Sequence, residues 1–445
     1  MVRHVAVIGA GIVGAATAVE LLRDGHRVTV IEPGEPGGEQ AASYGNGGWL
    51  SPSSVVPPTM PGLWRRVPRF LTDPLGPLTI RRGYVPRLAP WLLRFLQAGS
   101  SMARVEAIAR ALRPLVADAP ERHRRLAEQA GVAGLIERQG LLYIFPSRAD
   151  FEAEALAWRL RRDNGVQWLE LDGDKLRQQE PELDRRYTFG ALVQAGGNCT
   201  DPGAYVAALA SHAASLGATR VQAATTGFRI EAGRLKAVAT TLGDVACDGA
   251  VIAAGARSRA LARAAGDWVS LETERGYHAV ITAPGIGLRH PIMPSDGKMA
   301  VTMTHAGLRI AGQIELAGLD AAPDWRRAAI LRDHALRTFP NLPRDLPPER
   351  VRVWMGHRPS TPDGLPVIGA ASGCADVFHA FGHGHVGLAA GPVTGRLVAD
   401  LIGGLPPVID PAPYSPRRFA QRGRARDAAA ATGGTRHGRT ALHAR

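Results

Sequence analysis

Three glycines near the start of the chain have the spacing of a phosphate-binding turn. They are Gly9, Gly11 and Gly14, in the pattern G-x-G-x-x-G. Gly9 permits a tight turn, Gly11 lets a pyrophosphate approach the backbone, and Gly14 lets a helix pack closely on a strand. Ile12 and Val13 lie between the last two glycines, where the free N–H groups of a helix start favour an anion. The pattern therefore indicates a dinucleotide-binding turn.

The elements around this turn support the same interpretation. The apolar run 5–8 predicts a strand, 15–22 predicts a helix packed on a sheet, and 28–31 predicts a second apolar strand. Glu32 ends that strand, 18 residues after Gly14, where its carboxylate can bind the ribose hydroxyls of an adenosine. A purely structural glycine turn is the alternative. The complete order of strand, turn, helix, strand and acid favours the dinucleotide site.

Composition and charge limit the remaining classes of protein. The 445 residues are 45% hydrophobic and 21% charged, which is typical of a globular protein with two or three domains. No run approaches the ~20 apolar residues of a membrane-spanning helix. The net charge is +13, but the segment 417–445 holds eight arginines and one acid, for +7. We therefore predict a disordered basic tail with a modestly charged body, and no nucleic-acid partner.

The cysteines and histidines predict neither disulfides nor a metal site. Cys199, Cys247 and Cys374 are separated by 48 and 127 residues, which is neither a metal-ligand nor a redox spacing. Buried free thiols fit a reducing compartment, so we expect a cytoplasmic protein. Attraction of the basic tail to an anionic lipid surface would add peripheral contact with the inner face of the plasma membrane.

Four further segments have compositions that suit a binding site. The segment 41–61 is rich in Gly, Pro and Ser and predicts a long loop. The segment 251–256 is an apolar strand ending in small residues, suited to lie beside a cofactor. The segments 356–369 (G-H-R-P-S-T-P-D-G-L-P-V-I-G) and 381–388 (F-G-H-G-H-V-G-L) come late in the chain. The second of these precedes a helix and supplies a second glycine-rich helix N-terminus.

Together these motifs and the block E-T-E-R-G-Y-H at 272–278 resemble the FAD-dependent oxidoreductases of the D-amino-acid oxidase superfamily. The likeness is strongest to the bacterial D-amino-acid dehydrogenase family and extends from Val5 to about Pro411. It implies an α/β fold: a discontinuous, doubly wound FAD-binding domain with an inserted mixed α+β substrate domain. The expected ranges are 1–48, 190–265 and 350–416 for the FAD-binding domain, 49–189 and 266–349 for the substrate domain, and 417–445 for the disordered tail.

The resemblance implies where FAD binds. The N-terminal turn would hold the pyrophosphate, Glu32 the ribose, and the strand end at 254–255 would line the phosphates. The loop after residue 42 would lie near the isoalloxazine, and the turn at 384–388 would direct its helix dipole at the flavin N1 and C2 carbonyl. The implied cofactor-binding residues are Gly9, Gly11, Ile12, Val13, Gly14, Glu32, Ser43, Asn46, Gly48, Ala254, Gly255, Gly384, His385, Val386, Gly387 and Leu388.

The resemblance also implies an α-amino acid substrate, whose carboxylate suits a planar, bidentate arginine. Arg358, in G-H-R-P, matches the carboxylate-binding position, with a surface ion pair as its alternative. Tyr277 is a candidate for the same carboxylate, with a core tyrosine as its alternative. His278 is equally well explained as a structural histidine. Arg309 is a further candidate that would face the site from a strand.

The implied reaction is hydride transfer from the substrate Cα to flavin N5, followed by hydrolysis of the imine to a 2-oxo acid and ammonia. A cyclic substrate such as D-proline or cis-4-hydroxy-D-proline would give a cyclic imine instead. Electrons would pass to a quinone or another carrier, with oxygen as the alternative. An RNA-associated flavoprotein and a non-catalytic flavin-binding subunit are the competing classes. The sequence does not fix the oligomeric state.

Overall fold

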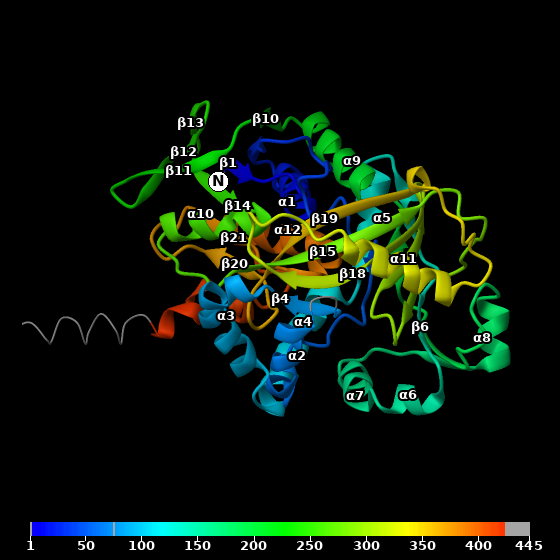
Figure 1. The fold of residues 1–445 in the computed structure, drawn as a ribbon. Coiled ribbons are helices and arrows are strands. Elements are labelled where there is room, and N and C mark those ends of the chain that lie inside the picture. Colours follow the sequence, from blue (N-terminus) through cyan, green and yellow to red (C-terminus); the bar gives the residue numbers. More distant parts are fainter. Residues whose placement is uncertain (1, 74–75, 423–445) are drawn as a thin grey trace, which may run out of the picture.

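The computed structural model describes residues 2–73 and 76–422, and the strands of these residues form four sheets (Figure 1). The first is a six-stranded sheet in the order β10-β2-β1-β14-β21-β20, parallel except for the last pair. Its strands come from the start, the middle and the end of the chain, which confirms the predicted discontinuous, doubly wound architecture. In sheet order they are β10 (Thr219–Val221), β2 (Arg27–Ile31), β1 (His4–Ile8), β14 (Gly249–Ile252), β21 (Val377–Phe381) and β20 (Val367–Ala370).

Alternating residues of β1 bury both faces of this sheet. Val5 and Val7 pack with the helices on one face, whereas Ala6 and Ile8 pack on the other. The first face is covered by α1 (Ile12–Arg23), α9 (Pro202–Ser215), α12 (Gly387–Gly403), α4 (Met102–Val116) and α5 (Ala119–Gln129). The second is covered by α10 (Ser258–Ala264) and by a sheet of β11 (Thr225–Glu231), β12 (Arg234–Thr240) and β13 (Gly243–Ala246). Both faces are therefore buried, as a parallel sheet requires.

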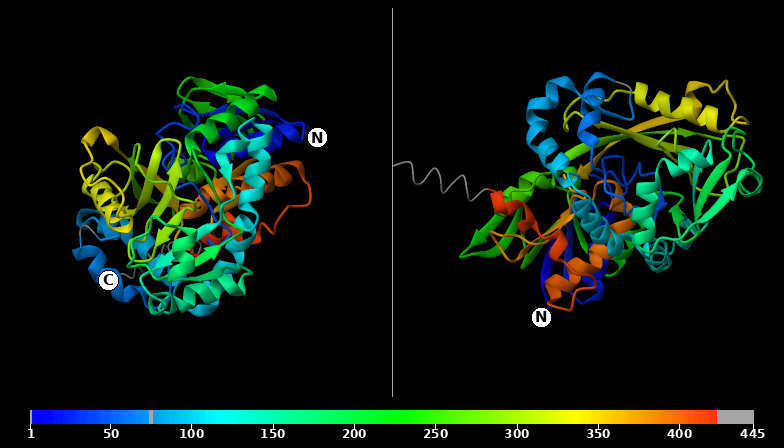
Figure 2. Two further views of the ribbon diagram at one scale, coloured as in Figure 1. Left: turned by 90° about the vertical axis from the view of Figure 1, so that its right-hand side faces the viewer. Right: turned by 90° about the horizontal axis from the view of Figure 1, so that it is seen from below.

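A nine-stranded mixed sheet forms the second body of the molecule (Figures 1 and 2). Its main path runs β19-β15-β18-β17-β16-β6-β8-β7, and β4 pairs with β18. The long strands β15, β18 and β19 dominate one end. The strands are β19 (Val351–Ser360), β15 (Glu272–Ile281), β18 (Gly307–Leu316), β17 (Ala300–Thr304), β16 (Ile292–Pro294), β6 (Leu141–Phe145), β8 (Phe189–Val193), β7 (Leu169–Asp172) and β4 (Leu78–Ile80).

The two faces of this sheet have different neighbours. One face packs on α11 (Arg326–Thr338) and α8 (Gly173–Gln179) through a cluster that includes Tyr277 and Leu331. Near one end of the other face lie α2 (Val67–Thr72) and α3 (Val85–Ala98), whose apolar side chains meet β4 and β18. The other described elements are α6 (Arg148–Glu152), α7 (Ala155–Asp163) and a small sheet of β3 (Trp49–Leu50), β9 (Gly197–Cys199) and β5 (Ile136–Glu137).

Strand pairing differs from the predicted domain ranges in two places. The range 350–416 was assigned to the FAD-binding domain, but β19 pairs with β15 in the nine-stranded sheet. The range 190–265 likewise began inside β8, which pairs with β6 and β7 of that sheet. Helices α4 and α5, placed in the substrate range 49–189, pack instead on α12 and α9. Local sequence carries no information on these long-range pairings.

The predicted start of the disordered tail, residue 417, lies inside a segment that the structure describes as ordered. Residues 416–422 form a 3-10 helix, and Arg418 donates hydrogen bonds to Asp363 Oδ2 (3.0 Å) and Leu365 O (2.6 Å). Phe419 packs on the apolar cluster around β14 and β21. The prediction of disorder is therefore wrong for the first residues of 417–445, and the remainder, 423–445, lies outside the described residues.

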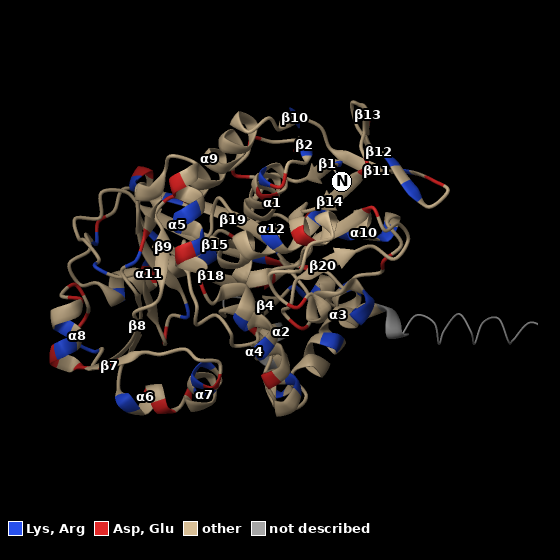
Figure 3. Cartoon of the chain, turned by 180° about the vertical axis from the view of Figure 1, so that it is seen from behind, with Lys and Arg blue, Asp and Glu red and all other residues tan. Residues whose placement is uncertain are grey.

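The described part of the chain distributes its charges evenly. Lys and Arg segments alternate with Asp and Glu segments on the same elements, as α5 and α8 show (Figure 3). Cys199, Cys247 and Cys374 are free and buried, as predicted. Gly384–Gly403 is long and apolar enough to cross a membrane, but 78% of its window is buried inside the fold. This segment contains α12, which is a core helix.

Candidate active site

The β1–α1 turn has the geometry that its glycines predict. Gly9 has a φ of +106°, and an added Cβ would lie 2.5 Å from Ala253 O. A Cβ on Gly14 would lie 1.9 Å from Gly9 O, so both glycines are needed for packing. A Cβ on Gly11 would meet only Ser43 Oγ, at 3.5 Å. Gly11 therefore leaves an open approach to the N-terminus of α1, as a pyrophosphate requires.

Two side chains hold the backbone around this turn. Glu32 is buried, and its carboxylate accepts hydrogen bonds from Ala10 N (2.9 Å) and Gly34 N (3.1 Å). Ser43 Oγ accepts a hydrogen bond from Ile12 N at 3.1 Å. The predicted adenosine side of the site is thus assembled around α1, and β14 brings Ala254 and Gly255 beside it. The turn fits the phosphate part of FAD.

The loop at 43–48 lies on the nine-stranded sheet and is fixed by side chains of that sheet. Arg309 donates from one guanidinium nitrogen to Tyr44 O (3.3 Å) and Asn46 O (2.9 Å). His278 Nδ1 lies 3.1 Å from Gly45 O, and Thr302 Oγ1 donates to Gly47 O at 2.8 Å. Burial, reinforced by Arg309, lowers the pKa of His278 to about 4. His278 is therefore neutral at pH 7 and donates its Nδ1 proton to the loop.

These contacts assign Arg309 and His278 to the loop. Both were predicted as catalytic residues; one nitrogen of each positions the segment expected beside the flavin, and their catalytic roles stay predictions. Within that loop, Asn46 Oδ1 accepts from Gly48 N at 2.9 Å, and Gly48 O accepts from Cys199 N at 2.7 Å. The loop is therefore a fixed surface between the two bodies of the molecule.

Tyr277, predicted as a catalytic residue, lies on the face of β15 opposite to that of Glu274 and Arg358. Its hydroxyl donates to Glu315 Oε2 (2.6 Å) and accepts from Asp324 N (3.0 Å), and the side chain is 1% exposed. Burial, with Glu315 next, raises the pKa of Tyr277 to about 12. Successive strand residues face opposite sides. Tyr277 therefore lies on the α11 side of the sheet. Arg275 lies on the same side, where its guanidinium forms a buried ion pair with Glu315 (3.0 Å).

Arg358 lies on the other face of the sheet, toward the turn before α12. Its strand register pairs it with Glu274, and its guanidinium lies over Gly276, where an added Cβ would be 2.2 Å from Cζ. One nitrogen donates to Gln313 O at 3.1 Å. Arg358 forms no ion pair within residues 2–73 and 76–422. Burial lowers its pKa, with Glu274 opposing, but a guanidinium stays charged in proteins.

Glu274 is the functional candidate that sequence reasoning missed. It is 5% exposed, and its Oε2 lies 2.7 Å from His385 Nε2. Burial acts to raise its pKa, but His385 and Arg358 outweigh that effect, so the pKa of Glu274 lies below its usual value. Ser360 is buried beside the same carboxylate, and a hydrogen bond from its side chain also lowers the pKa of Glu274. Strand periodicity could have indicated it, because residues 274, 276 and 278 share one face of the strand, whereas 275 and 277 share the other.

The turn at 382–388 approaches this cluster from the six-stranded sheet. Gly382 and Gly384 have φ of +86° and +51°, and Ser360 forms a β-bridge with His383. A 3-10 turn, Gly384–Val386, leads into α12. His383 Nε2 lies 2.9 Å from Thr394 Oγ1, and burial lowers its pKa to about 3. The N-terminus of α12 thus lies beside Arg358, Glu274 and Ser360, as a flavin site at this turn requires.

The residues expected to hold FAD fit that cofactor. The open N-terminus of α1, the fixed loop at 43–48 and the N-terminus of α12 line one interface between the two bodies. Trp49 Nε1, which follows the loop, is buried without a partner in the described residues, so it can bond a ligand. The roles of the individual cofactor-binding residues stay predictions. No group of three or more His, Cys, Asp or Glu in the described ranges is placed to hold a metal.

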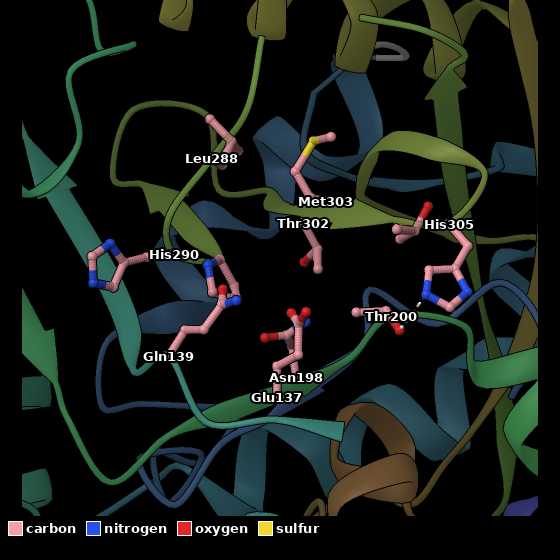
Figure 4. Close-up of a pocket in the computed structure, with 11 residues that line it drawn as sticks. Glu137, Gln139, Asn198, Thr200, Leu288, His290, Thr302, Met303 and His305 are labelled. Carbon is pink, nitrogen blue, oxygen red and sulfur yellow. Dashed lines mark hydrogen bonds between the residues drawn. The ribbon is translucent and has the colours of Figure 1, made fainter. Parts of the chain in front are cut away.

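A separate polar cavity of about 170 Å³ lies between β9 and the β16–β17 edge (Figure 4). Asn198 and Glu137 lie on one side of it and Thr302 on the other, and His290 lines its edge (Figure 4). Thr302 is also the donor to Gly47, so the cavity lies behind the loop at 43–48. None of the predicted site residues lines it.

Comparison with known proteins agrees with these features. A family model described as FAD dependent oxidoreductase, DAO, matches residues 4–401. A relative from Bradyrhizobium diazoefficiens named D-amino-acid oxidase is 58% identical over 417 residues, covering 94% of this chain and 99% of the relative. A Cereibacter sphaeroides relative named D-amino acid dehydrogenase is 32% identical, covering 95% and 96%. The structure of an L-proline dehydrogenase from P. horikoshii is 21% identical with a TM-score of 0.71, covering 94% and 98%, and shares the fold.

Proposed function

Since this chain belongs to the DAO family of FAD-dependent oxidoreductases, we propose that it oxidises D-amino acids to 2-oxo acids and ammonia. It is an FAD-dependent enzyme of amino acid oxidation, similar to D-amino-acid oxidases and dehydrogenases. When bound, FAD supplies the acceptor for the two electrons and the hydrogen that leave the substrate Cα. The remaining steps depend on how the chain binds and orients the amino acid.

The observation that carries the proposal is the buried guanidinium of Arg358, which faces Glu274 across the register but makes no direct ion pair in the described residues. A charge inside a protein is ordinarily paired, because removing it from water is costly. Arg358 makes one hydrogen bond to a backbone carbonyl and no ion pair in the described residues, although it stands between the α12 turn and the sheet. A substrate carboxylate completes this site by forming a bidentate pair with the guanidinium.

The walls of the site support an amino acid with an apolar side chain. Beside Glu274, the 3-10 turn Leu63–Arg66, α2, α3, β4 and β18 form an apolar region that includes Leu63, Ile80, Trp91, Phe95, Ile314 and Leu316. Trp91 is fixed by a hydrogen bond from Nε1 to Ser360 O at 3.1 Å. We infer that an amino acid bound at Arg358 would have its side chain near this apolar region.

The experiment is anaerobic reduction of the FAD-loaded protein by a panel of amino acids. Bleaching of the flavin band by D-amino acids, and not by their L-isomers or glycine, is the expected result. D-Proline and cis-4-hydroxy-D-proline belong in the panel, because a cyclic amine also presents a carboxylate to Arg358. Bleaching by L-isomers alone would refute the assigned stereochemistry, and bleaching by none would refute the proposed reaction.

The electron acceptor is measured in the second half of the same experiment. The relative at 58% identity is named an oxidase, and the relatives near 32% are named dehydrogenases. Mixing the substrate-reduced protein with air-saturated buffer or with a soluble quinone separates the two cases. Reoxidation by quinone but not by oxygen identifies a dehydrogenase. Rapid reoxidation by oxygen identifies an oxidase.

A further inference from the structure

A buried anion stands next to the cation that binds the substrate carboxylate. Glu274 and Arg358 are directly opposite each other in the β15–β19 register, and opposite residues of an antiparallel pair have Cβ atoms about 5 Å apart. Both side chains leave the sheet on the face toward the α12 turn. In an α-amino acid the carboxylate and the ammonium group are attached to the same carbon. Its two binding partners must therefore be neighbours of opposite charge.

We propose that Glu274 binds the α-ammonium group of the substrate while Arg358 binds its carboxylate. The inference rests on the proposed function and adds to it the group that selects an amine. A 2-hydroxy acid or a simple carboxylic acid presents the same carboxylate to Arg358 but has no cation for Glu274. The pair Arg358 and Glu274 therefore distinguishes amino acids from other carboxylic acids.

The surroundings of Glu274 keep its carboxylate charged and oriented. His385, from the turn before α12, bonds Oε2 at 2.7 Å. Ser360 lies beside the same carboxylate, and a hydrogen bond from its hydroxyl also favours the charged form of Glu274. His385 is 46% exposed and Glu274 7% exposed at the side chain, so the histidine lies between the buried acid and solvent. His385 acts as a positioning residue that directs Oε1 of Glu274 toward the substrate.

Ser360 adds a third polar group beside this pair. The residue is 3% exposed, its Oγ lies 3.3 Å from the position of a Cβ on Gly384, and its hydroxyl lies on the carboxylate of Glu274. Arg358, Glu274 and Ser360 thus present a cation, an anion and a hydroxyl around one point of the interface.

A neighbouring glutamate supplies a matched control. Glu272 lies on the same face of β15 and is 7% exposed, close to the value for Glu274. Its two carboxylate oxygens each accept from Tyr84 Oη at 3.1 Å, and its register partner is Ser360 rather than Arg358. Glu272→Gln therefore removes a buried carboxylate of the same strand without removing the partner of the ammonium group.

The test compares two ligands that differ only in the amino group. 2-Aminoisobutyrate has no hydrogen on its α-carbon, so the enzyme cannot oxidise it, and isobutyrate is the same molecule without the amino group. Binding of each to the FAD-loaded protein is read from the shift of the flavin absorption spectrum. We expect tighter binding of 2-aminoisobutyrate in the unmodified protein. Glu274→Gln should weaken its binding roughly 10- to 100-fold, the range for losing a charged hydrogen bond, and leave isobutyrate unchanged.

The outcomes separate this inference from the proposed function. Equal losses for both ligands in Glu274→Gln would show that Glu274 acts through Arg358, and unchanged binding of both would show that it has no role; either result overturns the inference. Loss of the preference for 2-aminoisobutyrate over isobutyrate in Glu272→Gln would also overturn the inference. Because no turnover is measured, the inference can hold in a protein that no D-amino acid of the panel reduces. In that case only the proposed reaction fails.

Discussion

Replacement of Gly276 by alanine tests the substrate role of Arg358 without touching that residue. An ideal Cβ on Gly276 would lie 2.2 Å from Cζ of Arg358 and 2.3 and 2.4 Å from its two terminal nitrogens. Ordinary van der Waals contact begins at 3.4 Å. The guanidinium must therefore leave the sheet surface by about 1 Å or turn aside. The backbone of β15 should remain in place, because the atoms that clash are the far end of a flexible side chain.

A displacement of this size is large for a bidentate contact. Misplacing a binding group by about 1 Å costs on the order of 100-fold in reaction rate, which is about 2.7 kcal/mol at 1.36 kcal/mol per factor of ten. We expect Gly276→Ala to lower the ratio of the reduction rate to the half-saturating D-amino acid concentration by about that factor. FAD content should not change, because the β1–α1 turn that we expect to hold the phosphates is in the other body of the molecule.

The assay is stopped-flow anaerobic flavin reduction, with flavin occupancy and thermal unfolding measured on the same sample. Gly227→Ala is the matched control, because Gly227 also lies in a strand, β11, and its added Cβ meets nothing within 4 Å. That variant should reduce flavin at the rate of the unmodified protein. Wild-type half-saturation in a folded, FAD-loaded Gly276→Ala variant would refute the position assigned to the guanidinium or its role.

Further perturbations test the cofactor turn, the loop, the buried histidines and the chain end. Gly11→Val should abolish FAD binding, measured as flavin per protein, because the open approach to the α1 N-terminus closes; full occupancy would contradict the assignment. Arg309→Met should slow flavin reduction and increase proteolysis of the loop at 43–48, whereas a pure loss of substrate affinity would show that Arg309 contacts substrate. Burial lowers the pKa of His123 from 6.5 to about 4, so the unfolded state takes up a proton that the fold excludes. Stability should therefore fall between pH 6.5 and 4 by up to about 3 kcal/mol, and His123→Gln should flatten that slope in thermal unfolding. A protein that lacks 417–445 should melt at a lower temperature than one that lacks only 423–445. The reason is the loss of the charged hydrogen bonds of Arg418, worth roughly 1–3 kcal/mol. Equal melting temperatures would contradict the packing of residues 417–419.

The first strand, turn and helix could be predicted because their signal is local. The strand expected at 5–8 is His4–Ile8, and the helix expected at 15–22 lies within Ile12–Arg23. Apolar periodicity and the glycine spacing are both contained in a few consecutive residues. The turn before α12 was predictable for the same reason. These are the parts of the site that are expected to bind the cofactor.

The substrate side could be predicted only in part, because it depends on register between distant strands. Arg358 belongs to a recognisable motif, but its neighbour Glu274 precedes it by 84 residues in the chain. A shift of one residue in that register would turn Tyr277 toward the site and Glu274 away from it. The same limit explains Arg309, whose partners are backbone carbonyls of a loop more than 260 residues earlier.

The central claim is that Arg358 binds the carboxylate of a D-amino acid beside the flavin, and Arg358→Ala tests it most directly. The measurement is anaerobic flavin reduction over a range of D-amino acid concentrations, with Arg358→Lys in parallel. The account predicts that Arg358→Ala retains FAD but is no longer saturated by the amino acid, and that Arg358→Lys is markedly impaired because it loses the planar fork. Reduction at the unmodified rate with unchanged half-saturation in Arg358→Ala would contradict the account.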